Sequence, residues 1–318
     1  MTPKRIRDFR IDALGVAVLA PLLLVPVLST SNLVFSLTNQ IAIGITAAMA
    51  VYIMLRMNLL SFTVPSFMAV GGYTAALLAS NGVTNLIVLL AASFLVPMLV
   101  AIPIGVLVLR LRGVYFIFFT FILNEVLQVA IFETPSLTGG SNGIAGVPGA
   151  TLFGASFTTP ALIVTVTVVA TMLAALATLA VTQRFRPEFS AIEENETLSA
   201  SLGVAVWKYR SIGFMASAGV AGLAGFALVH QLSTAHPSSF GSLSAINYVA
   251  YAFVGGKGTL LGPAVGATLL IYMSNIFSSQ GEYAAALFGV LLIAVVMIAP
   301  GGLVGLLRRG LARLARGL

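Results

Sequence analysis

The chain has 318 residues, of which 59% are hydrophobic and 8% are charged, and its formal net charge is +7. A soluble domain of this size could not bury so much apolar side chain, because its surface would have to carry most of it. The composition therefore excludes a water-soluble globular protein and indicates one that lies in a lipid bilayer.

Apolar segments of about membrane-spanning length follow one another along the whole chain. The first, at 14–28, follows a basic N-terminus, and we interpret it as a span, with a cleaved signal peptide as the alternative. Further segments are predicted at 33–55, 59–79, 86–109, 114–132, 160–182, 211–232, 243–254, 261–277 and 283–299. We therefore predict an all-α, polytopic helical membrane protein, with about ten hydrophobic segments in a single transmembrane domain over residues 1–318. Some of these segments are expected to be short or re-entrant.

The basic residues share one side of the membrane when the N-terminus is placed in the cytoplasm and the segments alternate. That side receives all 16 of them: Lys4, Arg5, Arg7, Arg10, Arg56, Arg110, Arg112, Arg184, Arg186, Lys208, Arg210, Lys257, Arg308, Arg309, Arg313 and Arg316. The opposite side receives Glu133 and Glu282 and no lysine or arginine. This asymmetry predicts cytoplasmic N- and C-termini, and it favours anionic lipid over nucleic acid as the partner of the positive charge.

Two long connectors separate the segments. The outer loop, 133–159, is rich in glycine, serine and threonine, and the inner loop, 183–210, carries the densest charge. Within the inner loop, acidic residues precede a short Ala/Leu/Ser stretch that ends at Gly203, which predicts a short helix closed by glycine. Such a helix is suited to docking into a groove of a partner protein, and a solvated loop is the alternative.

Glu125 is predicted to lie deep in the 114–132 segment. An ionised carboxylate in hydrocarbon is costly, so this side chain should face the bundle interior, a cavity or the membrane boundary. Asn124 and Gln128 are close enough in sequence to share its hydrogen bonds. Two interpretations remain open: a substrate or gating contact, and a polar clamp between helices.

Glycines serve two predicted structural purposes. The four-residue spacings at Gly222 and Gly262 place small residues on one helix face, which predicts close backbone packing. The glycines of a late turn, Gly255, Gly256 and Gly258, resemble a phosphate-binding loop, but Gly258 follows the lysine where serine or threonine is required. We therefore predict a tight cytoplasmic turn there and no nucleotide site.

Little in the chain predicts catalysis or metal binding. There is no cysteine, and the two histidines, His230 and His236, have no carboxylate nearby in sequence. We therefore expect no catalytic residue, no metal site and no cofactor. An ion-coupled secondary transporter is an alternative class, but such proteins place several ionisable groups at mid-membrane and Glu125 alone is a thin basis.

Several short motifs occur along the chain in the same order as in a known protein family. They are LRGVYF at 111–116, LTGGSNG at 137–143, SAIEENE at 190–196 with SLG at 201–203, AGLAG at 221–225, GGKGTLLGP at 255–263 and APGGL at 299–303. Together they resemble the permeases of the branched-chain amino acid ABC transporter family, LivM type. Ser190 and Glu193 stand where that family usually has arginine.

The resemblance implies the membrane-spanning permease subunit of an ATP-binding-cassette importer in the bacterial inner membrane. Its implied partners are a second permease chain in a heterodimer, two ABC ATPase subunits, a periplasmic or extracellular substrate-binding protein and membrane lipid. The residues implied to couple to the ATPase are Glu194, Glu196, Leu202 and Gly203. Those implied for the translocation path or outer loop are Glu125, Thr138, Gly139, Gly140, Ser141 and Asn142. Branched-chain amino acids are the implied cargo, with urea, short amides and small aromatic acids as alternatives.

Overall fold

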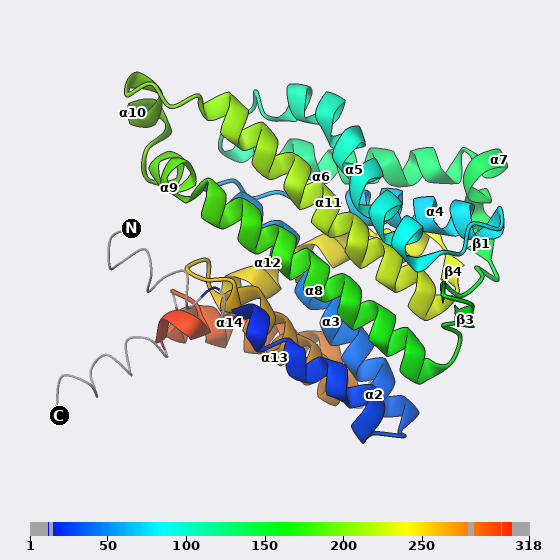
Figure 1. Ribbon diagram of the computed structural model, residues 1–318. Helices are drawn as coiled ribbons and strands as arrows, with labels where there is room; N and C mark the ends of the chain where they lie inside the picture. Colours follow the sequence, from blue (N-terminus) through cyan, green and yellow to red (C-terminus); the bar gives the residue numbers. More distant parts are fainter. Residues whose placement is uncertain (1–11, 13–14, 279–282, 300, 307–318) are drawn as a thin grey trace, which may run out of the picture.

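The computed structural model of the chain describes residues 12, 15–278, 283–299 and 301–306, and most of these residues are helical (Figure 1). The longer helices are α3 (Asn32–Leu55), α4 (Val64–Ser80), α5 (Leu86–Val108), α6 (Val114–Phe132), α8 (Pro160–Arg184), α11 (Val206–Leu232), α12 (Ser242–Gly255), α13 (Leu261–Ser278) and α14 (Ala284–Ile298). The shorter ones are η1 (Ala20–Leu24), α2 (Val25–Leu28), α7 (Pro135–Thr138), η2 (Gly140–Asn142), α9 (Arg186–Glu194), α10 (Glu196–Ser201) and η3 (Pro237–Phe240).

Four two-residue strands were not expected from the sequence. β1 (Ile144–Ala145) pairs antiparallel with β4 (Thr234–Ala235), and β2 (Thr151–Leu152) pairs antiparallel with β3 (Ala155–Ser156). β1, β2 and β3 lie in the glycine-rich outer loop and β4 in the connector after α11; in both connectors the extended backbone groups still need hydrogen-bond partners.

Six helices in the described residues are long and apolar enough to cross a membrane: α3, α5, α6, α8, α11 and α13. Shorter apolar helices cover Gly15–Leu28, Val64–Ser80 and Ala286–Val295. The protein is therefore a polytopic helical membrane protein, whereas the count of ten segments and the cytoplasmic position of the termini stay predictions. Eight of the basic residues used for that orientation, within 1–11 and 307–318, lie outside the described residues.

The α9–α10 end of the bundle and the end that carries α7 and the strands are opposite in Figure 1. We call them the inner and outer ends, following the predicted orientation. All the long helices run between these two ends, so each end collects connectors that are far apart in sequence.

Prolines explain where two helices depart from the predicted segments. Pro21 and Pro26 each lie in the first turn of a short helix, so the first segment is divided into η1 and α2. Pro65 likewise opens α4 at Val64, and 59–63 is therefore non-helical instead of forming the start of the predicted span. The backbone N–H of Phe62 in this stretch donates to Thr120 Oγ1 on α6, at 3.2 Å. Irregular backbone at membrane depth is tolerated where protein supplies such partners.

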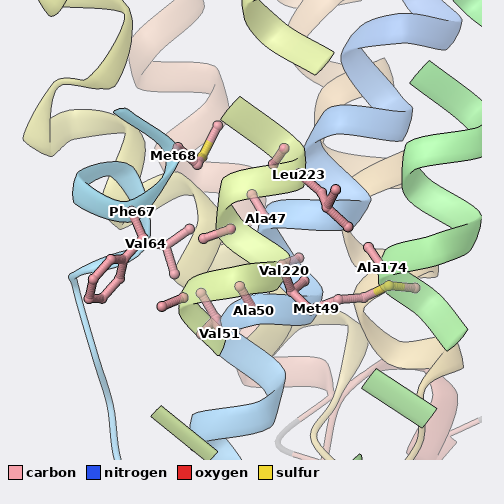
Figure 2. Close-up of a cluster of buried hydrophobic side chains, with 14 of the residues drawn as sticks. Ala47, Met49, Ala50, Val51, Val64, Phe67, Met68, Ala174, Val220 and Leu223 are labelled. Atoms are coloured by element: carbon pink, nitrogen blue, oxygen red, sulfur yellow. The ribbon is translucent and has the colours of Figure 1, made fainter. Parts of the chain in front are cut away.

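Helix α11 is the centre of the bundle and packs against α3, α4, α5 and α8. Figure 2 shows apolar side chains from α3, α4, α8 and α11 filling the space between these helices; the labelled ones are Ala47, Met49, Ala50, Val51, Val64, Phe67, Met68, Ala174, Val220 and Leu223. In lipid such helices associate through close packing, because hydrocarbon is as apolar as the side chains themselves.

The predicted close packing at glycines is present where α11 crosses α4 and α5 and where α12 meets α13. A Cβ on Gly225 would collide with the Met68 carbonyl oxygen of α4, and one on Gly222 would collide with the Ser93 carbonyl oxygen of α5. At the crossing of α12 and α13, a Cβ on Gly262 would collide with the Gly256 carbonyl oxygen. Any larger side chain at these positions would force two backbones apart.

Candidate functional site

The first candidate site is the coupling segment, residues 186–203, which forms α9 and α10 at the inner end. Asn195 separates the two helices with an extended backbone conformation (φ −158°, ψ 108°), and its Oδ1 accepts the backbone N–H of Leu198 at 3.0 Å. Gly203 ends the segment at φ +87°, a conformation that residues with a Cβ rarely adopt. A short helix closed by Gly203 is thus present as predicted.

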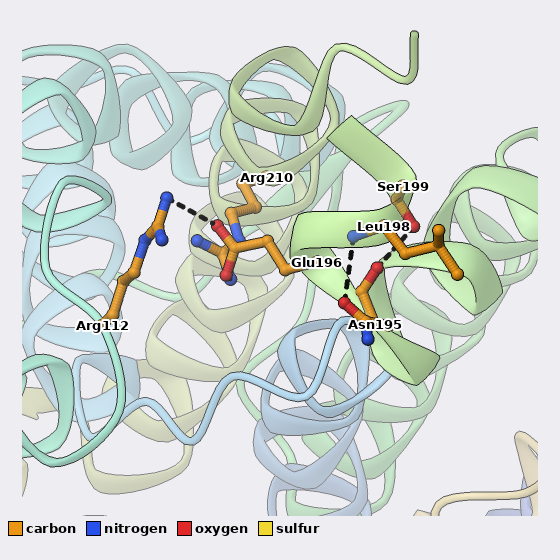
Figure 3. A network of polar contacts seen from close by, with 6 residues as sticks. All are labelled: Arg112, Asn195, Glu196, Leu198, Ser199 and Arg210. Carbon is orange, nitrogen blue, oxygen red and sulfur yellow. Dashed lines mark hydrogen bonds and ion pairs between the residues drawn. The ribbon is translucent and has the colours of Figure 1, made fainter. Parts of the chain in front are cut away.

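Glu196 connects the coupling segment to two other parts of the chain (Figure 3). Arg210 Nη2 on α11 donates to Glu196 Oε2 at 2.7 Å, and Arg112 Nη2, between α5 and α6, lies 3.4 Å from Glu196 Oε1. Arg210 is buried, and charge-assisted hydrogen bonds of this kind are stronger than neutral ones. Glu196 therefore faces the bundle of its own chain.

Glu193 makes a similar connection to two further parts. Its carboxylate lies 2.8 Å from Lys257 Nζ, in the turn after α12, and 3.8 Å from Arg56 Nη1, at the end of α3. Arg56 Nη2 also donates to Ser190 Oγ at 3.3 Å. The two positions that depart from the family pattern, Ser190 and Glu193, thus both contact Arg56 of the same chain.

The opposite face of the coupling segment is exposed. Leu198 and Leu202 are 56% and 76% exposed, and Glu194 is exposed beside them. Trp207, at the start of α11, is 59% exposed. Leu198 and Trp207 are not among the residues predicted from the sequence, although the four-residue spacing of Leu198 and Leu202 is a usable signal for one helix face.

The second candidate site surrounds Glu125 on α6. Hydrogen bonds run from Ser66 Oγ on α4 to Asn124 Oδ1 (2.7 Å), from Asn124 Nδ2 to Ser242 Oγ on α12 (2.8 Å), and from Ser242 Oγ to Glu125 Oε1. Gln128 Nε2 donates to the Pro237 carbonyl oxygen at 3.3 Å. Asn124 is buried, whereas Glu125 is exposed on the surface of this chain. A carboxylate in the middle of an apolar helix is thus both linked to α12 and open to a ligand or a neighbouring chain.

The third candidate site is the 138–142 segment of the outer loop. Thr138 is buried and its Oγ1 donates to the Ile131 carbonyl oxygen at 2.6 Å, while Gly139 and Gly140 adopt φ +76° and +57°. Ser141 and Asn142 follow and are exposed. The first three residues therefore shape the turn, and the last two present side chains to the outside.

His236 joins this segment to the connector after α11. Its Nε2 donates to the Ser141 carbonyl oxygen at 2.9 Å, and its Nδ1 accepts the Ser238 backbone N–H at 3.2 Å. Both nitrogens are thus engaged within the outer end, beside the β1–β4 pair.

The remaining glycine positions lie in the turn between α12 and α13. Gly255 is the last residue of α12, and Gly256 follows at φ +101° against Gly301 and Gly302. A Cβ on Gly258 would meet nothing within 4 Å. This turn also presents Lys257 to Glu193, so it belongs to the inner ion-pair network.

Comparison with known proteins identifies the chain's relatives. Residues 33–300 match the family described as branched-chain amino acid transport system / permease component. Two curated relatives are the high-affinity branched-chain amino acid transport system permease proteins LivM of Salmonella typhimurium and Escherichia coli; each is 26% identical over 266 residues, which cover 76% of this chain and 63% of the relative. The match thus spans less than two thirds of the length of these relatives, and no solved structure matches the chain. Since the family match extends over most of its length, the chain belongs to the branched-chain amino acid transport permease family.

Proposed function

We propose that this chain is a membrane-spanning permease subunit of an ATP-binding-cassette importer in the bacterial inner membrane. It would form the solute pathway with a second permease chain and would be driven by two separate ATPase subunits. A binding protein on the outer side would deliver the solute. Family membership supports the transport class, and the coupling segment is the observation that supports ATPase-driven operation.

The coupling segment has the two faces that transmission of force requires. Glu193 and Glu196 connect it to the inner ends of α3, α11, α12 and the α5–α6 connector. Leu198 and Leu202 project from it as exposed apolar side chains, as expected for a helix that enters a groove of a partner. A movement of the partner would thus reach several membrane helices at once through these ion pairs.

The proposed cargo follows the names of the relatives, which describe branched-chain amino acid transport. Urea, short amides and small aromatic acids remain alternatives, because the delivering protein selects the solute. The Glu125 cluster, with its exposed carboxylate, is the proposed contact along the pathway. The outer residues Ser141 and Asn142 are the proposed contact for the binding protein.

The test is assembly with the ATPases. The double variant Leu198→Ala/Leu202→Ala should reduce ATPase co-purification at least about tenfold, since that factor needs a loss of only about 1.4 kcal/mol of binding free energy. Leu243→Ala is the matched control, because Leu243 is a leucine on α12 with a similar exposure, 74%, and is not part of the coupling segment. Unchanged co-purification of the double variant would count against the coupling face.

The energy source of uptake distinguishes an ion-coupled transporter, the alternative class, from an ATP-driven importer. In proteoliposomes, uptake that follows an ion gradient without ATP, together with no association with any ATPase, would favour that class. For the pathway itself, Glu125→Gln should lower the rate of ATP-driven uptake if the carboxylate contacts the solute. Unchanged uptake in that variant would favour the polar clamp between α6 and α12.

A further inference from the structure

A narrow slot lies between the inner parts of α5 and α11, and we call it the α5–α11 slot. Its volume is about 150 Å³, below the about 300–1,000 Å³ of pockets that hold drug-sized ligands. Small residues in its lining, Gly105 of α5 and Ser211 of α11, leave this space open. The larger lining residues include Ile102, Val106, Trp207 and Met215. The slot therefore fits a narrow segment of a ligand.

The α5–α11 slot opens on the surface of the bundle. Ile102, Val106 and Trp207, which line it, are all exposed. Apart from the Ser211 hydroxyl and the indole N–H of Trp207, the lining is apolar, so transfer of a hydrocarbon chain into it is favourable. Tryptophan is enriched at the level of lipid headgroups, because its ring is apolar and its N–H is polar. The slot is thus apolar and ends at a residue typical of the headgroup boundary.

The packing of α5 against α11 shows which residues lie level with this end of the slot. A Cβ on Gly222 would collide with the Ser93 carbonyl oxygen, and a Cβ on Gly105 would lie 3.2 Å from Phe214 Cδ1. Contacts that advance along α5 while they go back along α11 mean that the two helices are antiparallel. The same alignment places the residues just after α5 level with the first turn of α11.

Arg110 and Lys208 occupy this level, and their charges are unpaired. Both are exposed, and neither has an ion pair in the part of the chain that the structure describes. Their neighbours two residues further along, Arg112 and Arg210, both bind Glu196 instead. A cation near an anionic lipid surface strengthens binding by about fivefold, so this pair would favour an anion beside the mouth of the slot.

A second apolar groove provides the contrast. It has about 520 Å³ between α5 and α8, and its lining includes Ile87, Leu90 and Leu173 but no cationic side chain. Hydrocarbon can fill that groove, yet nothing in its lining selects a headgroup. Arg184, at the inner end of α8, is an exposed cation that lies over the ring of Phe185 and does not line the α5–α11 slot. Only at the α5–α11 slot do these features occur together.

We propose that the α5–α11 slot binds an anionic phospholipid, with part of one acyl chain between the two helices and the phosphate beside Arg110 and Lys208. The apolar lining accounts for the chain, and the two unpaired cations account for the anionic headgroup. A free anion would not need the slot, and a neutral lipid would not need the cations. With the predicted orientation, the lipid comes from the inner leaflet. This site goes beyond the proposed function and does not depend on it.

The single tryptophan of the chain provides a direct test, because Trp207 itself lines the slot. The full chain is reconstituted in phosphatidylcholine nanodiscs that contain increasing amounts of a phospholipid with brominated acyl chains. This phospholipid is phosphatidylglycerol in one series and phosphatidylcholine in the other, and bromine quenches indole fluorescence only at close range. We expect half-maximal quenching at an at least about tenfold lower content of the brominated phosphatidylglycerol, since two cations favour it.

Charge variants test the headgroup contact. Lys208→Gln and Arg110→Gln should each reduce the preference for phosphatidylglycerol by about fivefold. Arg184→Gln removes the same charge at the inner end of α8 and is the matched control, for which we expect no change. Equal quenching by the two lipids in the unaltered chain, or an equal loss in Arg184→Gln, would mean a general attraction of the basic chain for anionic lipid and would overturn the proposal.

A variant without a charge change tests the acyl-chain contact. Ser211→Leu fills the slot and should raise the content of brominated phosphatidylglycerol needed for half-maximal quenching at least about tenfold, whereas Ser211→Ala leaves the slot open and should not. Unchanged quenching in Ser211→Leu would place the chain elsewhere and refute the slot. Absence of quenching by either lipid would show that the slot is closed to the bilayer, which also contradicts the proposal. No solute, ATPase or binding protein enters these measurements, so they stand apart from the tests of transport.

Discussion

The inner and outer ends of this protein are held together by different interactions. At the inner end, the coupling segment is attached by ion pairs through Glu193 and Glu196, each of which meets two cations. At the outer end, the connectors are attached by the β1–β4 backbone pair, by left-handed glycines and by the hydrogen bond from His236 to Ser141.

These two kinds of interaction respond differently to displacement. Ion pairs between long side chains tolerate small displacements, because charge attraction falls gradually with distance. Backbone pairs and glycine turns have one geometry, and a shift of a few ångströms breaks them. In the proposed importer, these properties would suit the inner end to transmit movement and the outer end to present a fixed surface.

The largest effect is expected when a side chain is added at a crowded glycine of the outer end. Gly143→Ala places a Cβ against the Ala235 carbonyl oxygen at φ +65°, whereas Gly146→Ala meets nothing within 4 Å at φ +69°. The first should lower the local opening free energy of the β1–β4 pair by about 2–4 kcal/mol and the second by about 1–2 kcal/mol. Hydrogen exchange of residues 144–147 measures both, and equal effects would contradict a rigid β1–β4 contact.

The next effect concerns the inner end. Glu196→Gln removes the carboxylate partner of buried Arg210 and should destabilise the coupling segment by about 1–3 kcal/mol. Glu194→Gln is the control, since Glu194 is exposed and has no ion pair in the described part of the chain. Hydrogen exchange across 186–203 distinguishes them, and a larger effect at Glu194 would reverse the assignment of the two faces.

A smaller effect is expected at His236, which connects the 138–142 segment to the connector after α11. His236→Ala removes the hydrogen bond to the Ser141 carbonyl oxygen and should weaken the outer end by about 1 kcal/mol. Ser238→Ala leaves that bond in place and should change less. The readout is proteolysis of the 138–145 segment in intact proteoliposomes, where identical rates for the two variants would deny His236 this role.

The smallest effect is a response to salt. Raising ionic strength from about 0.05 to 0.5 M should lower the opening free energy of the coupling segment by a few tenths of a kcal/mol, because partly exposed ion pairs are screened. The β1–β4 pair should not respond. Parallel hydrogen exchange of both ends provides the comparison, and equal responses would show that charge does not distinguish them.

Much of the helical fold was predictable because membrane spans carry their signal locally. The 114–132 segment coincides with α6, and the 160–182 and 261–277 segments fall within two residues of α8 and α13. The predicted 211–232 segment begins five residues after the start of α11 at Val206. The charged side chains of Lys208 and Arg210 lower the hydropathy of the first turns of this helix. Hydropathy predicts the part of a helix that contacts lipid, but it does not predict turns of the same helix that extend into water.

The candidate sites were predictable only in part. The short helix before Gly203 and the exposed side chains of Glu194 and Leu202 follow from local composition. The partners of Glu196 do not, since Arg112 and Arg210 reach it only after distant helices have packed. The sequence interpretation placed Glu196 among the contacts to an ATPase, whereas the fold directs it toward its own chain.

Membrane residence, the helical class, most helix bounds and the family could be recognised from the sequence, because each depends on composition or on motifs that are continuous in the chain. Packing of the folded chain adds which acids face the bundle and how Ser66, Asn124, Ser242 and Glu125 connect three helices. These features join residues separated by tens to more than a hundred positions. Only the packing of distant helices, such as α4, α6 and α12, brings them within a few ångströms of each other.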